Sequence, residues 1–251
     1  MNHSQSQGVS FLILKEFAID FPYQPQSEAV EHLMLKYRLT REEAVRLDYQ
    51  ENWKWKRREY GLQTRCMTAF FERLFPGMQT EGIWKIIVEC VPVVGNERMS
   101  GIGGVLSIPM SFDLEGFLKS GDTDKKKITL DLLMQGIEKA ARVQEWELSV
   151  FEKVADEIRA AEYRNEWVWK KAKHPETGES AEVLCQHSVQ YMDLFLVIKD
   201  KNGIVKKQTK ILSEQPDEFA YARHLGSLRW IKSHTVQLLN RKGQIVQEVG
   251  N

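Results

Sequence analysis

Residues 122–164, DTDKKKITLDLLMQGIEKAARVQEWELSVFEKVADEIRAAEYR, form the stretch around which this chain is organised. Apolar side chains recur in it at spacings of three and four, which places them on one face of a helix. These side chains are Leu133, Ile137, Ala140, Ala141, Leu148, Phe151, Val154, Ala155 and Ile158. Asp122 and Asp124 can cap the start, and the stretch contains no proline. We predict one long amphipathic helix over these residues.

The width of the apolar stripe indicates what this helix contacts. Val143, Trp146 and Val150 widen the stripe, so the helix has room for two neighbours. A dimerisation or partner-binding helix is one interpretation, and a core helix lying on a sheet is the other, which we prefer. Gly136 is its weak point, because glycine inside a helix costs about 1 kcal/mol relative to alanine.

The composition is that of an ordinary globular protein. The 251 residues include 35 Lys and Arg against 35 Asp and Glu, so no net charge attracts nucleic acid or an anionic membrane. No window approaches the roughly 20 apolar residues that cross a bilayer, and residues 1–8 do not resemble a signal peptide. Cys66, Cys90 and Cys185 have the wide spacing and apolar neighbours of buried thiols in a reducing compartment. We expect a cytoplasmic protein without a membrane segment.

The residues before the long helix mix strands and helices. β-Branched and aromatic runs predict strands over residues 9–19, 83–94 and 102–112. Thr40 and Glu43 have the spacing of a capping box, so a helix begins there. Asp113 can cap a short helix that precedes the long one.

After the long helix, the hydrophobic period changes from about 3.6 to about 2, as expected for strands. The predicted strands cover residues 166–171, 183–187, 189–199, 204–212, 228–239 and 244–249. Asn202 and Gly203 are typical of a type I′ hairpin turn. The result is an antiparallel meander of about six strands.

These elements together predict an α+β fold. It has an N-terminal mixed helix and strand region (1–120), the long amphipathic helix (121–164) and the C-terminal antiparallel sheet (165–251), either as separate parts or as one continuous domain.

One segment interleaves aromatic residues with cations: Trp53, Lys54, Trp55, Lys56, Arg57 and Arg58. Such a segment can stack on bases and neutralise phosphates, which makes it a candidate nucleic-acid contact. The alternative is a helix with a cationic solvent face. On that helix Trp53 and Trp55, about 200° apart, cannot both point inward, so one is partly exposed. Glu51 and Glu59 dilute the positive charge.

The residues between the two middle strands offer a candidate cofactor loop. Arg98, Gly101 and Gly103 fit the Arg-x-x-Gly-x-Gly pattern and so resemble the coenzyme A loop of GNAT-type acetyltransferases. That resemblance implies a strand-to-helix turn whose amides hold a pyrophosphate. The residues after Gly104 look like a strand, and Pro109 would break the required helix. The alternative is a hairpin whose glycines relieve crowding.

The C-terminal region contains candidates for acid–base or nucleophilic chemistry. Cys185 and His187 would face the same side of a strand, and with His174 they could form a metal site or a Cys–His pair. No further ligand is identifiable, so we predict no metal site and no bound cofactor. Asp193 and Glu89 interrupt apolar strands and could act as acids or bases, or could point to the solvent side of a sheet.

No motif of the common serine hydrolases, zinc proteases, P-loop proteins or EF-hands is present in the sequence. Our first hypothesis is a non-enzymatic intracellular protein-binding protein, of the inhibitor or immunity type. Its candidate anchors are Trp167, Trp169, Tyr191 and Trp230, because Tyr and Trp are favoured at interfaces. The alternatives are an acyl-coenzyme A-dependent transferase using residues 101–104 and a nucleic-acid-binding protein using residues 54–58.

Overall fold

The computed structural model describes residues 11–95, 99–232 and 235–250. The chain divides into two compact units, Met1–Ala160 and Ala161–Asn251. Helices and a largely parallel sheet form the first unit, and antiparallel strands dominate the second, so the predicted α+β class is confirmed. No described helix is both long enough and apolar enough to cross a bilayer.

The main sheet of the first unit has the strand order β2-β4-β6-β5. Its strands are β2 (Glu16–Asp20), β4 (Lys85–Val91), β6 (Val105–Ser111) and β5 (Ser100–Ile102). Strands β2, β4 and β6 run parallel, and β5 runs antiparallel to β6. The glycine hairpin considered above does form, but it joins β5 to β6 rather than β4 to β6. A separate antiparallel pair consists of β1 (Phe11–Leu14) and β3 (Met78–Glu81).

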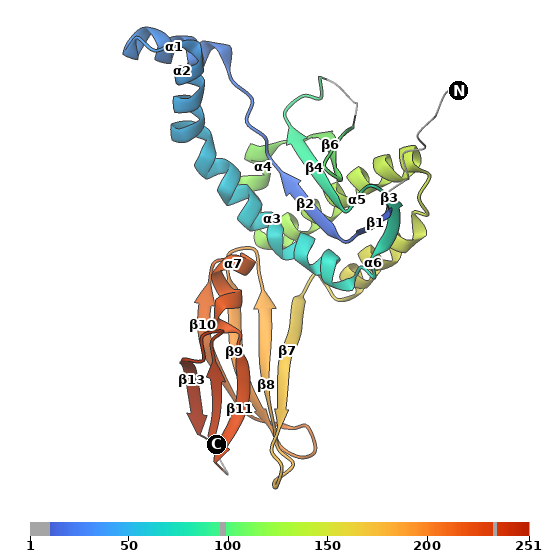
Figure 1. Cartoon of the computed structure of the whole chain (residues 1–251), viewed down its shortest axis with the longest axis vertical. Helices are drawn as coiled ribbons and strands as arrows, with labels where there is room; N and C mark the ends of the chain where they lie inside the picture. The colour runs from blue at the N-terminus through green and yellow to red at the C-terminus, as the bar shows by residue number, and fades with distance from the viewer. Residues whose placement is uncertain (1–10, 96–98, 233–234, 251) are drawn as a thin grey trace, which may run out of the picture. The chain divides into compact units, whose positions relative to one another are not determined.

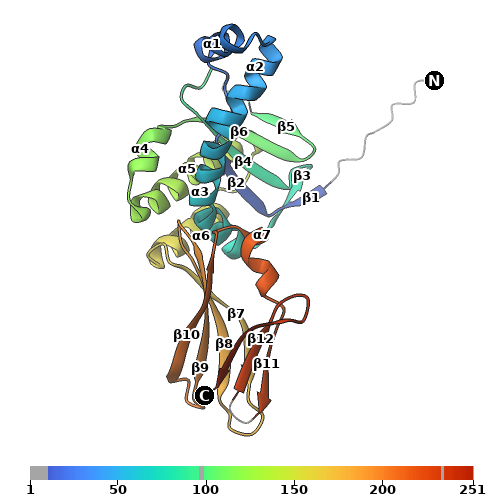
Figure 2. The ribbon, with the colours of Figure 1, turned by 90° about the vertical axis from the view of Figure 1, so that its left-hand side faces the viewer.

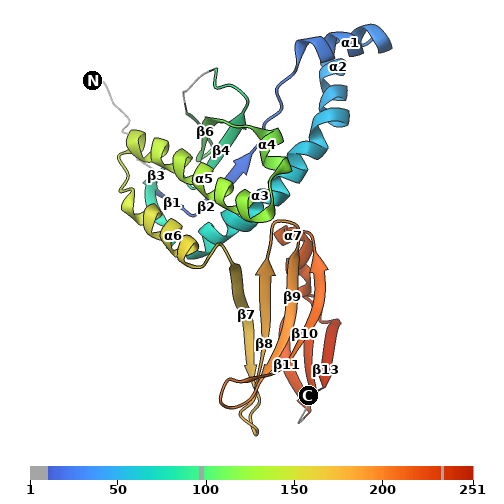
Figure 3. The ribbon, with the colours of Figure 1, turned by 180° about the vertical axis from the view of Figure 1, so that it is seen from behind.

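One face of the main sheet is covered by α3 (Lys54–Leu74), α5 (Asp122–Gln144) and α6 (Ser149–Ala160). Phe17 of β2 packs edge-on against Phe71 of α3 and Phe151 of α6, with ring centroids 4.9 and 6.3 Å apart. Gly136 of α5 lies against Val88 of β4. Figure 1 shows β2 and β4 facing the viewer, and Figure 3, from behind, shows α5 in front of them. The core of this unit lies between these helices and this face.

The helix predicted over residues 122–164 begins at Asp122, but its N-cap is Gly121 and not an aspartate as predicted, and the helix is broken in two. Helix α5 ends at Gln144, where Glu145 takes a left-handed φ of 54° and donates its N–H to the carbonyl of Ala141. Glycine or asparagine usually occupies this capping position. Because a glutamate stands here and the apolar periodicity continues past it, the sequence gave no sign of the break. The prediction of a single helix is therefore wrong over residues 145–148, and it is also wrong over residues 161–164, because the second helix ends at Ala160.

Helix α6 turns back along α5, and Arg159 forms an ion pair with Asp131 at 3.7 Å. The longest continuous helix of the described residues lies elsewhere. It consists of α2 (Arg41–Asp48), the π-helical turn η1 (Tyr49–Trp53) and α3. The predicted capping box is confirmed, since Thr40 and Glu43 exchange hydrogen bonds at its start.

Two shorter helices complete the first unit. Helix α1 (Ser27–Tyr37) packs on α2, away from the main sheet, around a small core of Val30, Leu33 and Ala44. Helix α4 (Leu114–Lys119) begins as predicted, because the Asp113 side chain accepts the N–H of Gly116 at 3.0 Å.

The second unit contains the antiparallel sheets β10-β9-β8-β7 and β11-β12-β13, and Figure 2 shows α7 beside them. The strands are β7 (Asn165–Lys173), β8 (Ser180–His187), β9 (Met192–Lys199), β10 (Val205–Glu214), β11 (Ser227–Lys232), β12 (Thr235–Leu239) and β13 (Ile245–Gly250), and the helical turns are α7 (Glu218–Tyr221) and η2 (Ala222–His224). Side chains of both sheets, among them Val183, Leu194 and Leu238, share one buried core. The described residues hold seven strands where about six were predicted, because residues 228–239 fold back as the hairpin β11–β12.

Candidate functional site

The main sheet of the first unit has a second face, opposite the helices. Its side chains alternate along the strands with the buried Phe17, Ile86 and Val88, and each keeps part of its surface exposed. We call it the open face, and it consists of Glu16, Ala18, Asp20, Lys85, Ile87, Glu89, Ser100, Ile102, Val105, Ser107 and Pro109. Parallel strands are normally covered on both faces, so a partly exposed face of this kind is unusual.

The middle of the open face is mainly apolar. Ala18, Ile87 and Ser107 stand in register across β2, β4 and β6. Beside this row Val105 pairs with Ile102 across the β5–β6 hairpin, and 82 % of Ile102 is exposed. Ala18 and Ser107 are the small side chains of the central row, and they lie on either side of Ile87.

Charged residues border the apolar middle at both ends. At one end Lys85 forms an ion pair with Glu16 at 3.3 Å, so these charges compensate each other. At the other end Asp20 and Glu89 stand side by side in register. Arg57 of α3 binds Asp20 through Nε at 2.8 Å and Nη2 at 2.5 Å. These hydrogen bonds raise the pKa of Arg57 above its ordinary value, so the guanidinium stays charged.

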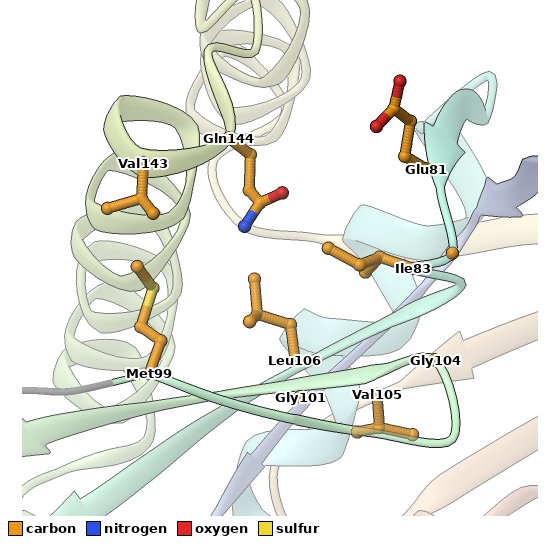
Figure 4. A pocket seen from close by; sticks show the side chains of 10 residues that line it. Glu81, Ile83, Met99, Gly101, Gly104, Val105, Leu106, Val143 and Gln144 are labelled. Carbon is orange, nitrogen blue, oxygen red and sulfur yellow. The ribbon is translucent and has the colours of Figure 1, made fainter. Parts of the chain in front are cut away.

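A pocket of about 640 Å³ lies on the other side of the β5–β6 hairpin. Figure 4 shows Leu106 and Gln144 directed into it from β6 and α5, while Val105 points away toward the open face. Among the described residues that line it, Glu81 is the ionisable one.

The glycines proposed to hold coenzyme A form the turn of this hairpin. Gly103 and Gly104 have φ values of 60° and 81°, as in a type I′ turn. Trp84 donates its Nε1–H to the carbonyl of Gly103 at 2.9 Å, and its ring occupies the place of a side chain at Gly104. Strand β6 follows, and the strand-to-helix turn required for coenzyme A is not formed. Gly101 lies in β5, and Arg98 is outside the described residues.

The cationic aromatic segment is divided between the core and the surface. Trp53 stacks on Phe21 with ring centroids 4.8 Å apart and points inward, whereas 53 % of Trp55 is exposed. This confirms the prediction that both rings cannot be buried. Arg57 is held by Asp20, and Lys54 and Arg58 are exposed on the helix. The segment therefore does not present a continuous stacking surface for bases.

The structure does not bring Asp193 together with Cys185 and His187. Cys185 and His187 face the core of the second unit, where His187 Nε2 lies 3.3 Å from the carbonyl oxygen of Pro216. Asp193 lies on the opposite face of the sheet and accepts a bond from Lys210 at 2.9 Å. It cannot orient His187, because the sheet separates them. The catalytic set considered from the sequence is thus not assembled.

His174 has a place in the turn between β7 and β8. Its Nδ1 accepts the N–H of Glu176 at 3.1 Å, and its ring packs edge-on against Trp230 at 5.0 Å. These contacts hold the turn in place. Within the described residues, no three His, Cys, Asp or Glu side chains gather as a metal ion would require.

The aromatic residues expected to anchor a partner are mostly turned inward. Trp167, Trp169 and Trp230 pack against the core of the second unit, and Trp230 donates its Nε1–H to the carbonyl of Ala172 at 3.1 Å. Tyr191 is the exposed member of the set, with the Lys210 ammonium 5.7 Å from its ring centre. The three tryptophans are therefore partly buried and contribute to this core.

The open face was not found from the sequence. Ile87 and Glu89 alternate with buried residues, which signals a half-exposed strand, but the parallel pairing and the one-sided helical cover depend on distant parts of the chain. No family model, no curated protein and no solved structure matches this chain.

Proposed function

We propose that this chain is a non-enzymatic protein-binding protein and that its partner docks on the open face. The observation that carries the proposal is a sheet of parallel strands whose helices lie on one side, with Ala18, Ile87 and Val105 partly exposed on the other. Covering such a face removes apolar surface from water, which is the main source of association free energy.

Two further observations support binding rather than catalysis. Ile102 extends the apolar surface at the edge strand β5, where 82 % of it meets solvent. The ionisable groups of the open face are at its ends, and Lys85 is already paired with Glu16. The buried Cys66, Cys90 and Cys185, none of them in a disulfide among the described residues, suit a reducing compartment such as the cytoplasm, in keeping with a partner of the inhibitor or immunity type.

A site-specific crosslink tests this proposal. A photoreactive benzoylphenylalanine in place of Ser107 is expected to capture one partner in cells, and the same group in place of Glu157, on the exposed side of α6, is expected not to capture it. The captured protein, identified and purified, should bind the chain with at least tenfold lower affinity after Ile102→Asp.

The matched control for this test is Ile204→Asp, which changes a residue that is 64 % exposed in the second unit and should leave the affinity unchanged. Equal capture from positions 107 and 157, or equal binding by the two Asp variants, would contradict docking on the open face.

The coenzyme A alternative makes the opposite prediction for a small ligand. Acetyl-coenzyme A is a polyanion, and the pocket beside the hairpin offers it the carboxylate of Glu81 and no helix N-terminus at Gly103 and Gly104. Millimolar acetyl-coenzyme A is expected to leave the melting temperature unchanged, and a saturable rise would revive the transferase hypothesis.

A further inference from the structure

We infer that the segment that covers the open face is an amphipathic helix of the partner whose apolar stripe is flanked by Lys or Arg at the end that meets Asp20 and Glu89. This inference rests on the proposed function and adds the chemistry of the docking segment.

The dimensions of the open face fit a helix. Neighbouring strands lie about 4.8 Å apart, so β2, β4 and β6 present a surface about 10 Å wide, close to the diameter of a helix. From Lys85 to Glu89 the strand spans about 13 Å, which roughly nine helical residues match. The opposite face of the same strands is covered in this way by α5.

The central row supports the same choice of occupant. Ala18 and Ser107 are small and flank Ile87, so a helix laid along the strands meets one larger apolar side chain between two shallow positions. An extended strand would instead pair with the edge strand β5 through backbone hydrogen bonds, and it would not contact the central row.

The charges of the open face determine at which of its ends the Lys or Arg of the partner helix lies. At the Lys85 end the ion pair with Glu16 leaves no net charge. At the other end Asp20 and Glu89 are in-register neighbours, and Arg57 supplies one positive charge to Asp20. Like charges side by side on a sheet are unfavourable, and among the described residues of this end one carboxylate charge remains for a partner to neutralise. A Lys or Arg on the docking helix supplies it.

Two synthetic helical peptides of 18 residues test the inference. Both carry the same Leu and Ala stripe, and the residues that flank it are Lys in one and Glu in the other. Fluorescence anisotropy at low salt should show the Lys peptide binding at least tenfold more tightly than the Glu peptide. The ratio should fall as salt screens the charges.

Matched variants locate the effect. Glu89→Gln should remove most of the preference for the Lys peptide, and Glu89→Lys should reverse it. Glu157→Lys, a charge reversal on the exposed side of α6, should leave the preference unchanged, and Ile87→Asp should abolish binding of the Lys peptide. Circular dichroism and the melting temperature check that each variant remains folded.

The outcomes separate this inference from the proposed function. If both peptides bound equally and Ile102→Asp abolished their binding, the open face would still be a docking surface, but the predicted Lys or Arg on the helix would be wrong. If neither peptide bound while the crosslinked partner still bound at the open face, the prediction that the docking segment is a helix would be wrong. A preference that survives both Glu89 variants would place the cation elsewhere and also overturn the inference.

Discussion

Gly136 of α5 lies so close to Val88 of β4 that a Cβ atom at position 136 would overlap Cγ2 of Val88. The glycine that looks like a weak point in an isolated helix is thus the place where the helix approaches the sheet most closely. Helical propensity and packing make opposite predictions for this position, and packing should prevail because Val88 is fully buried.

Gly136→Ala is expected to lower the free energy of unfolding by about 1 to 3 kcal/mol, as other overpacked substitutions do. Propensity alone would raise it by about 1 kcal/mol. Urea denaturation decides between the two. Val88→Ala should offset part of the loss in the double variant, because it removes the methyl groups that overlap. Additive effects of the two substitutions would contradict the contact.

Gly104 and Gly101 lie in the same hairpin but in different surroundings. Gly104 has a positive φ and faces the ring of Trp84, whereas a Cβ at Gly101 has nothing within 4 Å. Gly104→Ala should lower the free energy of unfolding by about 1 to 3 kcal/mol, and Gly101→Ala should change it by less than about 0.5 kcal/mol. Thermal unfolding compares them directly. A larger loss at Gly101 would indicate a role for its backbone that the hairpin does not explain.

Glu182 is expected to make the second unit sensitive to acid. Burial by itself raises the pKa of Glu182, but hydrogen bonds from Lys199 at 2.5 Å and Lys171 at 2.9 Å outweigh it and lower the pKa below its ordinary value of 4.5. A carboxyl whose folded pKa is depressed stabilises the fold above its unfolded pKa and loses this contribution as the pH falls through the folded value.

Glu182→Gln should therefore lose less stability than the parent protein when the pH falls from about 6 to about 3. Urea unfolding at both pH values measures the difference. Glu166→Gln, at an exposed position of β7, is the control and should behave like the parent protein. Identical pH dependence in Glu182→Gln would show that the two lysines do not favour the charged carboxylate.

The buried thiols of the first unit should be unreactive in the folded protein. Burial raises the pKa of both Cys66 and Cys90 to about 12, from an ordinary value of 9.0. At pH 8 only about one thiol in ten thousand is then ionised. In a Cys185→Ser variant, Ellman's reagent should label neither residue within minutes and both promptly in urea. Rapid labelling in native buffer would mean that the helical layer opens readily.

Arg57 and Lys54 should respond differently to charge reversal. Arg57 forms an ion pair with Asp20, so Arg57→Glu should lower the free energy of unfolding by about 1 kcal/mol. The expected loss is modest because both side chains are partly exposed to solvent. Lys54→Glu should change it by less than about 0.5 kcal/mol. Retention on heparin is a second measurement, and it should be weak in the parent protein. Strong retention that Lys54→Glu abolishes would support a nucleic-acid contact.

The sequence by itself determined the features that depend on near neighbours. Thr40 with Glu43, and Asp113 with Gly116, cap their helices as predicted, because a cap involves groups three residues apart. The β9–β10 hairpin was also predicted, although its turn is not type I′. Gly203 has a positive φ there and Asn202 does not, while the type I′ turn occurs at Gly103 and Gly104.

Only the tertiary structure decided which strands pair in parallel, which face of the main sheet is left without helices and where the long amphipathic stretch breaks. The break at Glu145 follows from α6 folding back on α5, and the separation of Asp193 from His187 follows from their opposite faces of one sheet. Each depends on contacts between residues far apart in the chain, which hydrophobic periodicity does not encode. The open face, and with it the proposed docking of a partner, emerges at that level because a strand's exposure depends on what packs against it.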